Sequence, residues 1–468
     1  MNQAEDITSP MSPLERRASF SLAGIFALRM LGLFMLLPVL SLFSEQMDGA
    51  TPFLTGLAIS AYGLTQALFQ IPFGLLSDRY GRKPLITIGL LIFAGGSVLA
   101  ALSDSIVGVI AGRALQGSGA IAAAVMALAA DLTREVHRTK AMAVIGISIG
   151  VSFAVSVVAG PIIAGQIGIS GIFWVTAALA LIGIIVLWTL VPTPAVRRFH
   201  RDAEPVPAQF KTVLADAELL RLDIGILILH MILTAGFVVL PLALRDAGLA
   251  PADHWMIYLP VLVLSMAGAV PFIIIAEKKR KMKQVFLGAI GIIALGELGL
   301  SGGHDRLIDL VAFLFLFFAG FNLLEATLPS LISKTAPADL KGTAMGIYSS
   351  SQFLGAFLGG ISGGWIYGQW SISAVFLFCT AIALGWLLIA AYMQPPRHLS
   401  SMLLRVGEME EQQATLMSKQ MTEVEGVAEA VVLAVEGVAY LKVDNETLDR
   451  DRLFNLISQA AEVSPSAA

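Results

Sequence analysis

Charged side chains are scarce in this sequence. Asp, Glu, Lys and Arg make up 14% of its 468 residues, and 56% of the residues are hydrophobic, whereas soluble proteins carry about 25% charged residues. The mean hydropathy is correspondingly high, at +0.80. This deficit of charge excludes an ordinary soluble globular protein and indicates long apolar segments.

Cysteine is almost absent as well. Cys379 is the single cysteine, so no disulfide can form within the chain and no cysteine-based metal site is available. No nucleophile–base pair, metal-ligand cluster or phosphate-binding loop stands out. The sequence therefore predicts neither an enzyme nor a metal or organic cofactor. We also expect no cleavable signal peptide, because the first apolar stretch is too long and lacks a clear cleavage site.

Charge is missing above all from a few long stretches. Residues 84–103, 142–170 and 172–191 contain no Asp, Glu, Lys or Arg, and each is long enough for the roughly 20 residues with which a helix crosses a bilayer. Residues 342–396 are also free of charge, and as one straight helix they would be about 80 Å long. We therefore expect this stretch to fold back near Gly368–Ser371.

The whole pattern predicts an all-α membrane protein with twelve transmembrane helices in two halves of six, followed by a small α+β domain. The expected divisions are a first half (15–194), a cytoplasmic loop (195–219), a second half (220–395) and a last domain (400–462). The expected spans are residues 19–44, 53–76, 84–103, 106–130, 140–166, 171–192, 220–244, 255–276, 283–301, 307–333, 342–368 and 372–393.

Basic residues and an internal repeat give the expected topology. Nearly all Lys and Arg of the loops fall on one side, for example in Lys278–Lys283, and only Arg245 and Arg306 fall on the other. Basic loops remain in the cytoplasm, so we expect both termini to be cytoplasmic. At a shift of 200 residues Phe153 coincides with Phe353, which indicates a parallel repeat with the substrate path between its halves.

Three motifs lie on three of the expected elements. The loop after the second span contains Gly74, Asp78, Arg79, Gly81, Arg82 and Lys83, and the fourth span contains Arg113, Gln116, Gly117 and Gly119. The fifth span contains Gly146, Gly150, Gly160, Pro161 and Gly165. In these motifs the chain resembles the major facilitator superfamily over about residues 15–395, and the fifth-span motif resembles that of its proton-coupled drug antiporters. Two places depart from the pattern: Ala164 replaces a usual glycine, and residues 276–280 lack the Asp and Gly of the charged loop.

The resemblance implies that the charged loop is a latch on the cytoplasmic side. Asp78 would face the start of the eleventh helix at Lys341–Thr343, where free N–H groups and the helix dipole favour an anion by about 0.3–2 kcal/mol. Arg82 would pair with Asp131 at the end of the fourth span. The alternative is that the loop is only a tight turn carrying cytoplasmic charge.

The glycines of the fifth-span motif also have two interpretations. They can pack helices closely, or, as the resemblance implies, they let the two halves approach along a seal. Pro161 would permit a bend there.

Ionisable residues inside the expected spans are costly unless paired or hydrated, which makes them candidates for the transport path. They are Arg29, Arg113, His230, Glu297 and Glu325, with Gln116 and Asn322 as polar neighbours. The two arginines either contact substrate and its charges or join helices as struts. Glu297 is expected to face a polar gap near the surface.

Proton coupling needs a group that exchanges protons while access alternates. Carboxyl groups in buried sites and imidazoles can do so near neutral pH. Glu325 is the first candidate and His230 the second. The alternatives are a structural hydrogen bond or ion pair for Glu325, and a histidine satisfied by a neighbour for His230.

The last residues, 400–468, are acidic and contain neither Cys nor His. Their alternation predicts strands over 401–406, 428–435 and 438–443, helices over 410–422 and 448–460, and a hairpin at Glu436–Gly437. This βαββα order indicates a ferredoxin-like domain, which resembles the heavy-metal-associated fold without its ligands. Acidity argues against nucleic acid. The domain is either a tethered module or docks on basic loops such as Lys278–Lys283 and biases the gate.

We therefore expect a secondary transporter, specifically a proton-driven exporter of a small solute that needs no metal and no cofactor beyond the proton gradient. A metabolite symporter or uniporter, and a membrane sensor using the acidic domain, are the alternatives. The expected partners are a small-molecule substrate and the lipid bilayer, without nucleic acid. The expected state is a monomer, and the resemblance implies a bacterial inner membrane.

Overall fold

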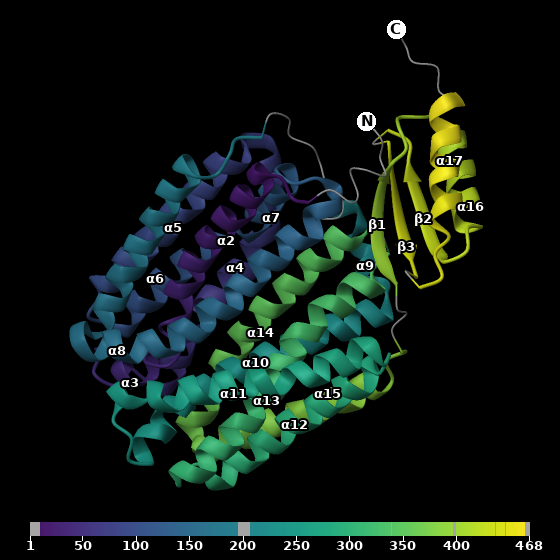
Figure 1. Cartoon of the computed structure of the whole chain (residues 1–468). Helices are drawn as coiled ribbons and strands as arrows, with labels where there is room; N and C mark the ends of the chain where they lie inside the picture. The colour runs from purple at the N-terminus through teal and green to yellow at the C-terminus, as the bar shows by residue number, and fades with distance from the viewer. Residues whose placement is uncertain are drawn as a thin grey trace.

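The computed structural model describes residues 10–194, 206–337, 339–395, 399–435, 437–444 and 446–463. Long helices form two bodies, one from each half of the chain, and a small sheet domain near the C-terminus lies against one end of them (Figure 1). Within the described residues, nine helices are long and apolar enough to cross a membrane, by length and composition.

The first half is helical throughout. Its helices are α2 (Pro13–Phe34), α3 (Leu40–Ser44), α4 (Pro52–Tyr80), α5 (Arg82–Ala101), α6 (Ile106–Ser118), α7 (Ala122–Asp131) and α8 (Glu135–Thr189). Side-chain caps set helix starts: the Ser12 hydroxyl accepts the Glu15 N–H while the Glu15 carboxylate accepts the Ser12 N–H. Such a capping box satisfies two donors that the first turn leaves free.

The second half is built in the same way. Its elements are the 3₁₀ turns η1 (Pro207–Gln209) and η2 (Pro251–Asp253) and the helices α9 (Phe210–Ala215), α10 (Ala217–Asp246), α11 (Trp255–Lys278), α12 (Met282–Gly303), α13 (Leu307–Thr335), α14 (Lys341–Gln369) and α15 (Ile372–Ala391). Ser371 caps α15, so the predicted fold-back between α14 and α15 is confirmed. Residues 195–205 of the predicted cytoplasmic loop lie outside the described residues.

Helix boundaries differ from the predicted spans in three places. The first predicted span, residues 19–44, is interrupted by a turn at residues 35–39 between α2 and α3. α8 joins the fifth and sixth predicted spans, and within it Gly168 has φ +70° and ψ −178°, which glycine adopts without steric penalty. The predicted fourth span is broken between α6 and α7 beside Gly119. A Cβ on this residue would lie 2.2 Å from the Gly89 carbonyl oxygen of α5, so only glycine permits the approach.

α4 and α14 are each 29 residues long, yet they are not among the nine apolar helices. Both contain many Gly, Ser and Gln residues, and they pack on each other between the two halves. Small and polar residues lower hydropathy but suit close helix packing. The contact between α4 and α14 therefore depends on small residues rather than on high hydropathy.

One end of the bundle, here named the closed end, holds the halves together. A Cβ on Gly56 of α4 would lie 2.1 Å from the Gly360 carbonyl oxygen of α14. Near the same end, Arg245 Nη1 of α10 lies 2.7 Å from Glu45 Oε2 of the first half. Glycine contact and ion pair together seal this end.

Aromatic rings also join the halves. The Phe153 ring of α8 packs against Phe237 and Phe318 of the second half, with centroids 6.4 and 6.3 Å apart. The Phe353 ring of α14 packs against Tyr62 of the first half at 6.1 Å. Phe153 and Phe353 are the positions that coincide in the sequence repeat, and each reaches into the opposite half.

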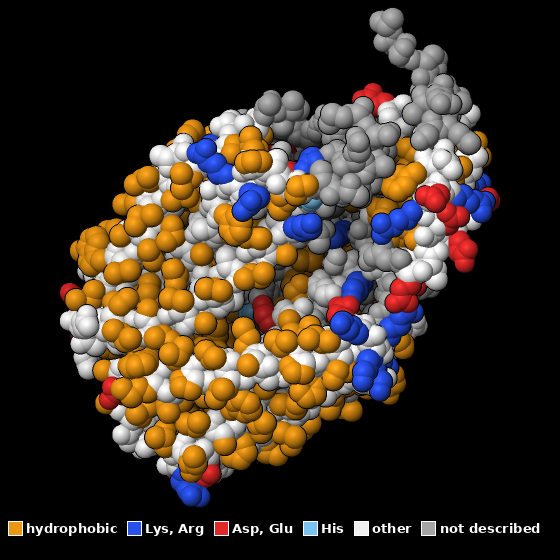
Figure 2. Space-filling model, in the orientation of Figure 1, with side chains coloured by type: hydrophobic (Ala, Val, Ile, Leu, Met, Phe, Trp, Pro, Cys, Tyr) orange, Lys and Arg blue, Asp and Glu red, His pale blue; other side chains and the backbone are white. Residues whose placement is uncertain are grey.

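The other end, here named the basic end, carries the loops at Arg79–Lys83 and Lys278–Lys283. Figure 2 shows a hollow between the two halves, with acidic and histidine side chains at its wall and basic side chains gathered towards the sheet domain. The two halves are thus in close contact at the closed end and separated by a hollow further along.

The C-terminal domain has a three-stranded antiparallel sheet. Its strands β1 (Ser400–Arg405), β2 (Val427–Leu433) and β3 (Val438–Val443) have the order β1-β3-β2. Helices α16 (Glu411–Thr422) and α17 (Arg450–Val463) lie on the sheet face away from the bundle (Figure 1). The predicted βαββα order is therefore observed in the described residues. Glu436 of the predicted hairpin lies outside them.

Candidate functional site

The charged loop between α4 and α5 turns at Gly81, whose φ of +101° favours glycine. The buried guanidinium of Arg82 donates to Asp78 and, over 2.7 Å, to Ser77 Oγ. Its Nε lies 3.3 Å from Asp131 Oδ2 of α7. The expected pair between Arg82 and Asp131 is present.

Asp78 does not reach α14 in this state. Within the described residues its polar partner is Arg82, and its side chain is 32% exposed. At the start of α14 the Thr343 hydroxyl donates to Gln209 Oε1 over 2.8 Å and accepts the Val206 N–H over 2.9 Å. The predicted contact between Asp78 and the start of the eleventh helix is therefore not formed in this state.

Other members of the motif hold the loop in place. Lys83 Nζ donates to the Val191 carbonyl beyond α8 over 2.6 Å, and Arg79 lies over the neighbouring tyrosine ring. A Cβ on Gly74 would lie 3.1 Å from the Ala123 Cβ of α7. These contacts attach the loop to α7 and α8 of its own half.

Arg29 is fully buried in the first half. Its Nη2 donates to Gln66 Oε1 over 2.6 Å and to the Gly119 carbonyl over 3.0 Å. The rings of Tyr62 and Phe93 lie 5.6 and 5.4 Å from its guanidinium carbon. Its Nε and Nη1 have no hydrogen-bond partner in the described part of the chain.

Arg113 has a more complete set of partners. Its Nε and Nη2 donate to the carbonyls of Ala58 and Ile59 over 3.3 and 3.0 Å, and its Nη1 donates to Gln116 Oε1 over 2.9 Å. Gln116 Nε2 in turn donates to Ser97 Oγ of α5 over 2.8 Å. The geometry favours the strut interpretation for Arg113, because these bonds join α6 to α4 and α5.

A polar cluster in the second half surrounds Glu325 of α13. Gln352 Nε2 of α14 donates to Glu325 Oε1 over 3.4 Å and lies 2.8 Å from His230 Nε2 of α10. His230 Nε2 is 3.9 Å from Glu325 Oε2, and the Glu325 side chain is 37% exposed. Asn322 donates instead to Ser265 Oγ of α11 over 2.9 Å. Three helices thus bring together Glu325 and His230, which the sequence analysis treats as two separate candidates for proton exchange.

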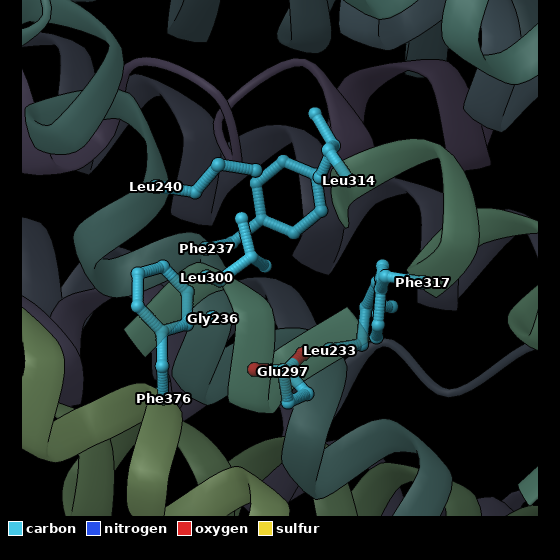
Figure 3. Close-up of a pocket in the computed structure, with 9 residues that line it drawn as sticks. All are labelled: Leu233, Gly236, Phe237, Leu240, Glu297, Leu300, Leu314, Phe317 and Phe376. Atoms are coloured by element: carbon cyan, nitrogen blue, oxygen red, sulfur yellow. The ribbon is translucent and has the colours of Figure 1, made fainter. Parts of the chain in front are cut away.

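Glu297 lies elsewhere, in a small cavity of the second half (Figure 3). The residues around it are apolar, among them Leu233, Phe317 and Phe376. Glu297 is 2% exposed, and its Oε2 has no partner among the described residues. The predicted polar gap near the surface is therefore wrong, because α10, α13 and α15 cover this face of α12.

The fifth-span glycines lie in different surroundings. A Cβ on Gly160 would lie 2.4 Å from a backbone oxygen between α2 and α3, whereas one on Gly165 would lie 3.5 Å from a side chain of the second half. No described atom lies within 4 Å of a Cβ placed on Gly146 or Gly150. α8 continues through Pro161. In this state Gly160 packs against its own half of the protein, whereas Gly165 faces the second half.

Two buried polar residues were not singled out by the sequence. Asp223 of α10 and Tyr348 of α14 are each 3% exposed, and their side-chain oxygens have no hydrogen-bond partner within the described residues. Asp223 stands beside Arg221 near the start of a predicted span, where a charge suggests a flank. The one feature of the sequence that could have identified Asp223 is its position inside that predicted span.

The chain matches the family model described as Major Facilitator Superfamily over residues 22–360 and 331–418. The chain belongs to the major facilitator superfamily. It is a membrane transport protein of that superfamily and not an enzyme.

The chain is similar to several transport proteins over most of its length. The inner membrane transport protein YajR of Escherichia coli (strain K12) is 49% identical over 451 residues, covering 96% of this chain and 99% of YajR. An uncharacterized transporter of Buchnera aphidicola subsp. Schizaphis graminum is 37% identical over 82% of this chain and 98% of its own length. The multidrug resistance protein MdtH of Yersinia pestis (strain Pestoides F) is 26% identical over 72% of this chain and 83% of MdtH.

Solved structures agree with the superfamily fold. A bacterial homolog of the human lysosomal transporter Spinster, in an inward-facing and occupied conformation, has a TM-score of 0.66 at 14% identity and covers 82% of this chain and 98% of its own. The human organic anion transporter MFSD10 has a TM-score of 0.61 at 19% identity, and the match covers 81% of this chain and 100% of the MFSD10 chain.

The C-terminal domain contacts the basic end of the superfamily bundle. Lys442 of β3 is 1% exposed, and its Nζ donates to the carbonyls of Ser333 and Lys334, over 2.6 and 3.3 Å, at the end of α13. Arg280 Nη2, between α11 and α12, lies 2.6 Å from Glu446 Oε2. β1 also contacts α8 of the first half. The expected contact with this basic loop is present, and a buried lysine adds to it.

Docking of this domain is expected to tighten as the pH rises from 7.5 to 9.5. Burial and the charge of Lys341 lower the pKa of Lys442 from 10.5 to about 8. Between those two values the released domain binds the proton more than the docked one, so docking gains free energy as pH rises there. We expect a gain of roughly twentyfold in the docking constant, measured by energy transfer between dyes on α17 and α12.

Two variants separate the contacts. Lys442→Met should remove the pH response, whereas Arg280→Ala should keep it and lose the dependence on salt, because exposed ion pairs are screened. A pH response that survives in Lys442→Met contradicts the assignment.

Proposed function

We propose that this protein is a proton-driven exporter of a small solute that works by alternating access. The observation that carries the proposal is the placement of Glu325, partly exposed and joined through Gln352 to His230, on three helices that meet where the halves face each other. Ionisable residues within transporter spans mark ion and proton paths. A partly exposed carboxyl group can load and release a proton as access changes.

The proposed topology has twelve spans. α8, with 55 residues, would be about 80 Å long if straight, more than twice the thickness of a bilayer core, so we count two spans that meet at Gly168. α4 and α14 are two further spans. The C-terminal domain, in this proposal, is ferredoxin-like.

The basic end is proposed to face the cytoplasm, following the positive-inside rule. Both termini and the C-terminal domain would then be cytoplasmic. The name and high identity of YajR support a bacterial inner membrane, and we propose that the protein acts there as a monomer.

Contact at the closed end, together with the open Asp78 contact, supports an inward-open state. In the opposite state the basic end would close, and Asp78 would meet the free N–H groups at the start of α14. The fifth-span glycines, Gly165 first, would then adjust the seal between the halves. A latch of this kind changes the balance between states by its differential contact energy.

Asp78→Asn is expected to cut export to about a tenth of wild type or less while the fold is kept. The substitution removes the charge that the α14 N-terminus would stabilise by up to about 2 kcal/mol, and 1.36 kcal/mol is tenfold in population. Export is measured in proteoliposomes, with Asp246→Asn, an exposed change at the closed end, as control. Wild-type export by Asp78→Asn refutes the latch.

The function itself is tested by a thermal-shift screen of small molecules on the purified protein, followed by flux of the stabilising compounds across an imposed pH gradient. Solute movement opposite to the proton gradient supports the exporter. Movement in the same direction as protons indicates a symporter, and movement indifferent to the gradient a uniporter. Absence of all carriage favours the membrane sensor.

A further inference from the structure

Asp223 lies in the seam where α10 packs on α14. The two helices touch backbone to backbone, because a Cβ on Gly355 would lie 2.1 Å from the Leu227 carbonyl oxygen and one on Gly359 would lie 2.2 Å from that of Met231. Asp223 is 3% exposed, and both of its carboxylate oxygens lack a hydrogen-bond partner among the described residues.

The surroundings of this carboxyl group, as far as the structure describes them, contain no paired cation. From α15 the Trp386 ring packs 3.1 Å from the place of a Cβ on Gly225, two residues beyond Asp223. Within the described residues Asp223 forms no ion pair, unlike Glu218, which pairs with Arg221 one turn earlier. An unpaired charge buried in this way is strongly unfavourable, so a proton is the counter-charge that suits the site.

Tyr348 stands on α14 between the level of Asp223 and that of the cluster around Glu325. Its hydroxyl is buried and has no hydrogen-bond partner in the described chain. Tyr348 stands one turn before Gln352 on α14, and Asp223 stands two turns before His230 on α10, about 10 Å along the axis. The polar groups thus form two levels, with the tyrosine between the two carboxyls.

The geometry points to Asp223 as a second proton-binding residue of the carrier, which exchanges its proton with Glu325 through the Tyr348 hydroxyl. This inference rests on the proposed function and deepens it. In the transfer the O–H bond of Glu325 breaks and its proton joins the phenol oxygen, while the phenol's own proton joins the Asp223 carboxylate. Tyr348 ends unchanged, and no electron moves. The tyrosine side chain must rotate, because no hydrogen bond joins these groups in this state.

The position of Asp223 gives the relay a direction. α10 begins at Ala217 on the basic end, and Asp223 lies six residues into it, nearer that end than His230. A proton loaded on Glu325 from the hollow therefore has a route towards the basic end within the second half. That route remains available when the hollow is closed at the basic end.

Proton uptake by the purified full-length protein tests the site without a substrate. The protein, in weakly buffered detergent solution with the pH dye pyranine, is taken from pH 8.5 to 5.5, and the protons bound are counted. Asp223→Asn should bind about one proton fewer than wild type, and the double variant with Glu325→Gln about two fewer. Full uptake by Asp223→Asn overturns the inference. Full uptake by Glu325→Gln alone instead counts against the proposed function.

Glu297→Gln is the matched control. Glu297 is equally buried but lies in an apolar cavity whose described lining residues carry no hydroxyl, so its replacement should leave the count unchanged. An equal loss in this variant would make uptake a general property of buried carboxyl groups and would overturn the assignment to a path.

Tyr348→Phe tests the relay itself. The variant keeps both carboxyl groups and should bind the same number of protons, but stopped-flow release from Asp223 should slow by roughly tenfold or more, because the transferring hydroxyl is gone. A structural role would alter stability and not this rate. Release at the wild-type rate overturns the relay.

Discussion

Glu325→Gln is expected to abolish solute movement driven by a pH gradient, by roughly a hundredfold or more. Glutamine keeps the size of the side chain and its bond to Gln352, but it cannot take up a proton. Exchange of solute down its own gradient should persist, because the path and the two halves are unchanged. The measurement is flux in proteoliposomes, with and without an imposed pH gradient, using a compound from the thermal-shift screen.

Two companion variants sharpen this result. His230→Asn should weaken coupling less than Glu325→Gln and shift its pH profile, because His230 lies 3.9 Å from the carboxylate and stabilises its charge when protonated. Glu297→Gln, away from the path, should transport like wild type. If the Glu325→Gln variant keeps gradient-driven flux, Glu325 is a structural residue. The proposal of a proton-driven exporter then loses the observation on which it rests.

Gly56→Val is expected to open the closed end. A Cβ there would lie 2.1 Å from the Gly360 carbonyl oxygen, far inside van der Waals contact, so the helices must separate. Overpacking of this kind costs about 1–3 kcal/mol, which changes the ratio of the two access states by about 5–150-fold. Export should fall because the state in which this end is closed becomes less favourable, so the carrier returns to it less often.

Distances between spin labels measure this shift. Labels on Gln46→Cys and Ala250→Cys, in a Cys379→Ser background, report separation of the halves at the closed end. The matched control is Gly385→Val on α15, where no described atom lies within 4 Å of the added Cβ. Unchanged distances in Gly56→Val would show that this glycine contact does not hold the end shut.

Much of the architecture was predictable from the sequence, because a bilayer imposes simple requirements. Long stretches without charge predicted membrane helices, since a span needs about 20 apolar residues. The alternation of apolar residues after residue 400 predicted the strands and helices of the C-terminal domain. The pair of Arg82 and Asp131 was anticipated as well, but from the resemblance to a family rather than from any spacing in the chain.

Predictions were weaker where the requirement was packing rather than hydropathy. Glu297 was expected near a polar gap, yet neighbouring helices bury it in an apolar cavity. Asp223 stands beside other charges near a helix start, and its burial depends on packing in the second half, where α14 lies against α10. Lys442 was one basic residue in an acidic domain until the end of α13 supplied two carbonyls for its ammonium group.

The sequence by itself predicts which segments are apolar enough to cross a membrane, where the chain divides and which loops are basic, because these depend on transfer energies of single segments and on local charge. The tertiary structure alone decided which polar groups share a site. Glu325, His230 and Gln352 come from three helices, and their meeting depends on how the glycine-bearing surface of α14 fits against the backbone of α10. Such a fit is a property of two surfaces at once, and neither surface specifies it alone.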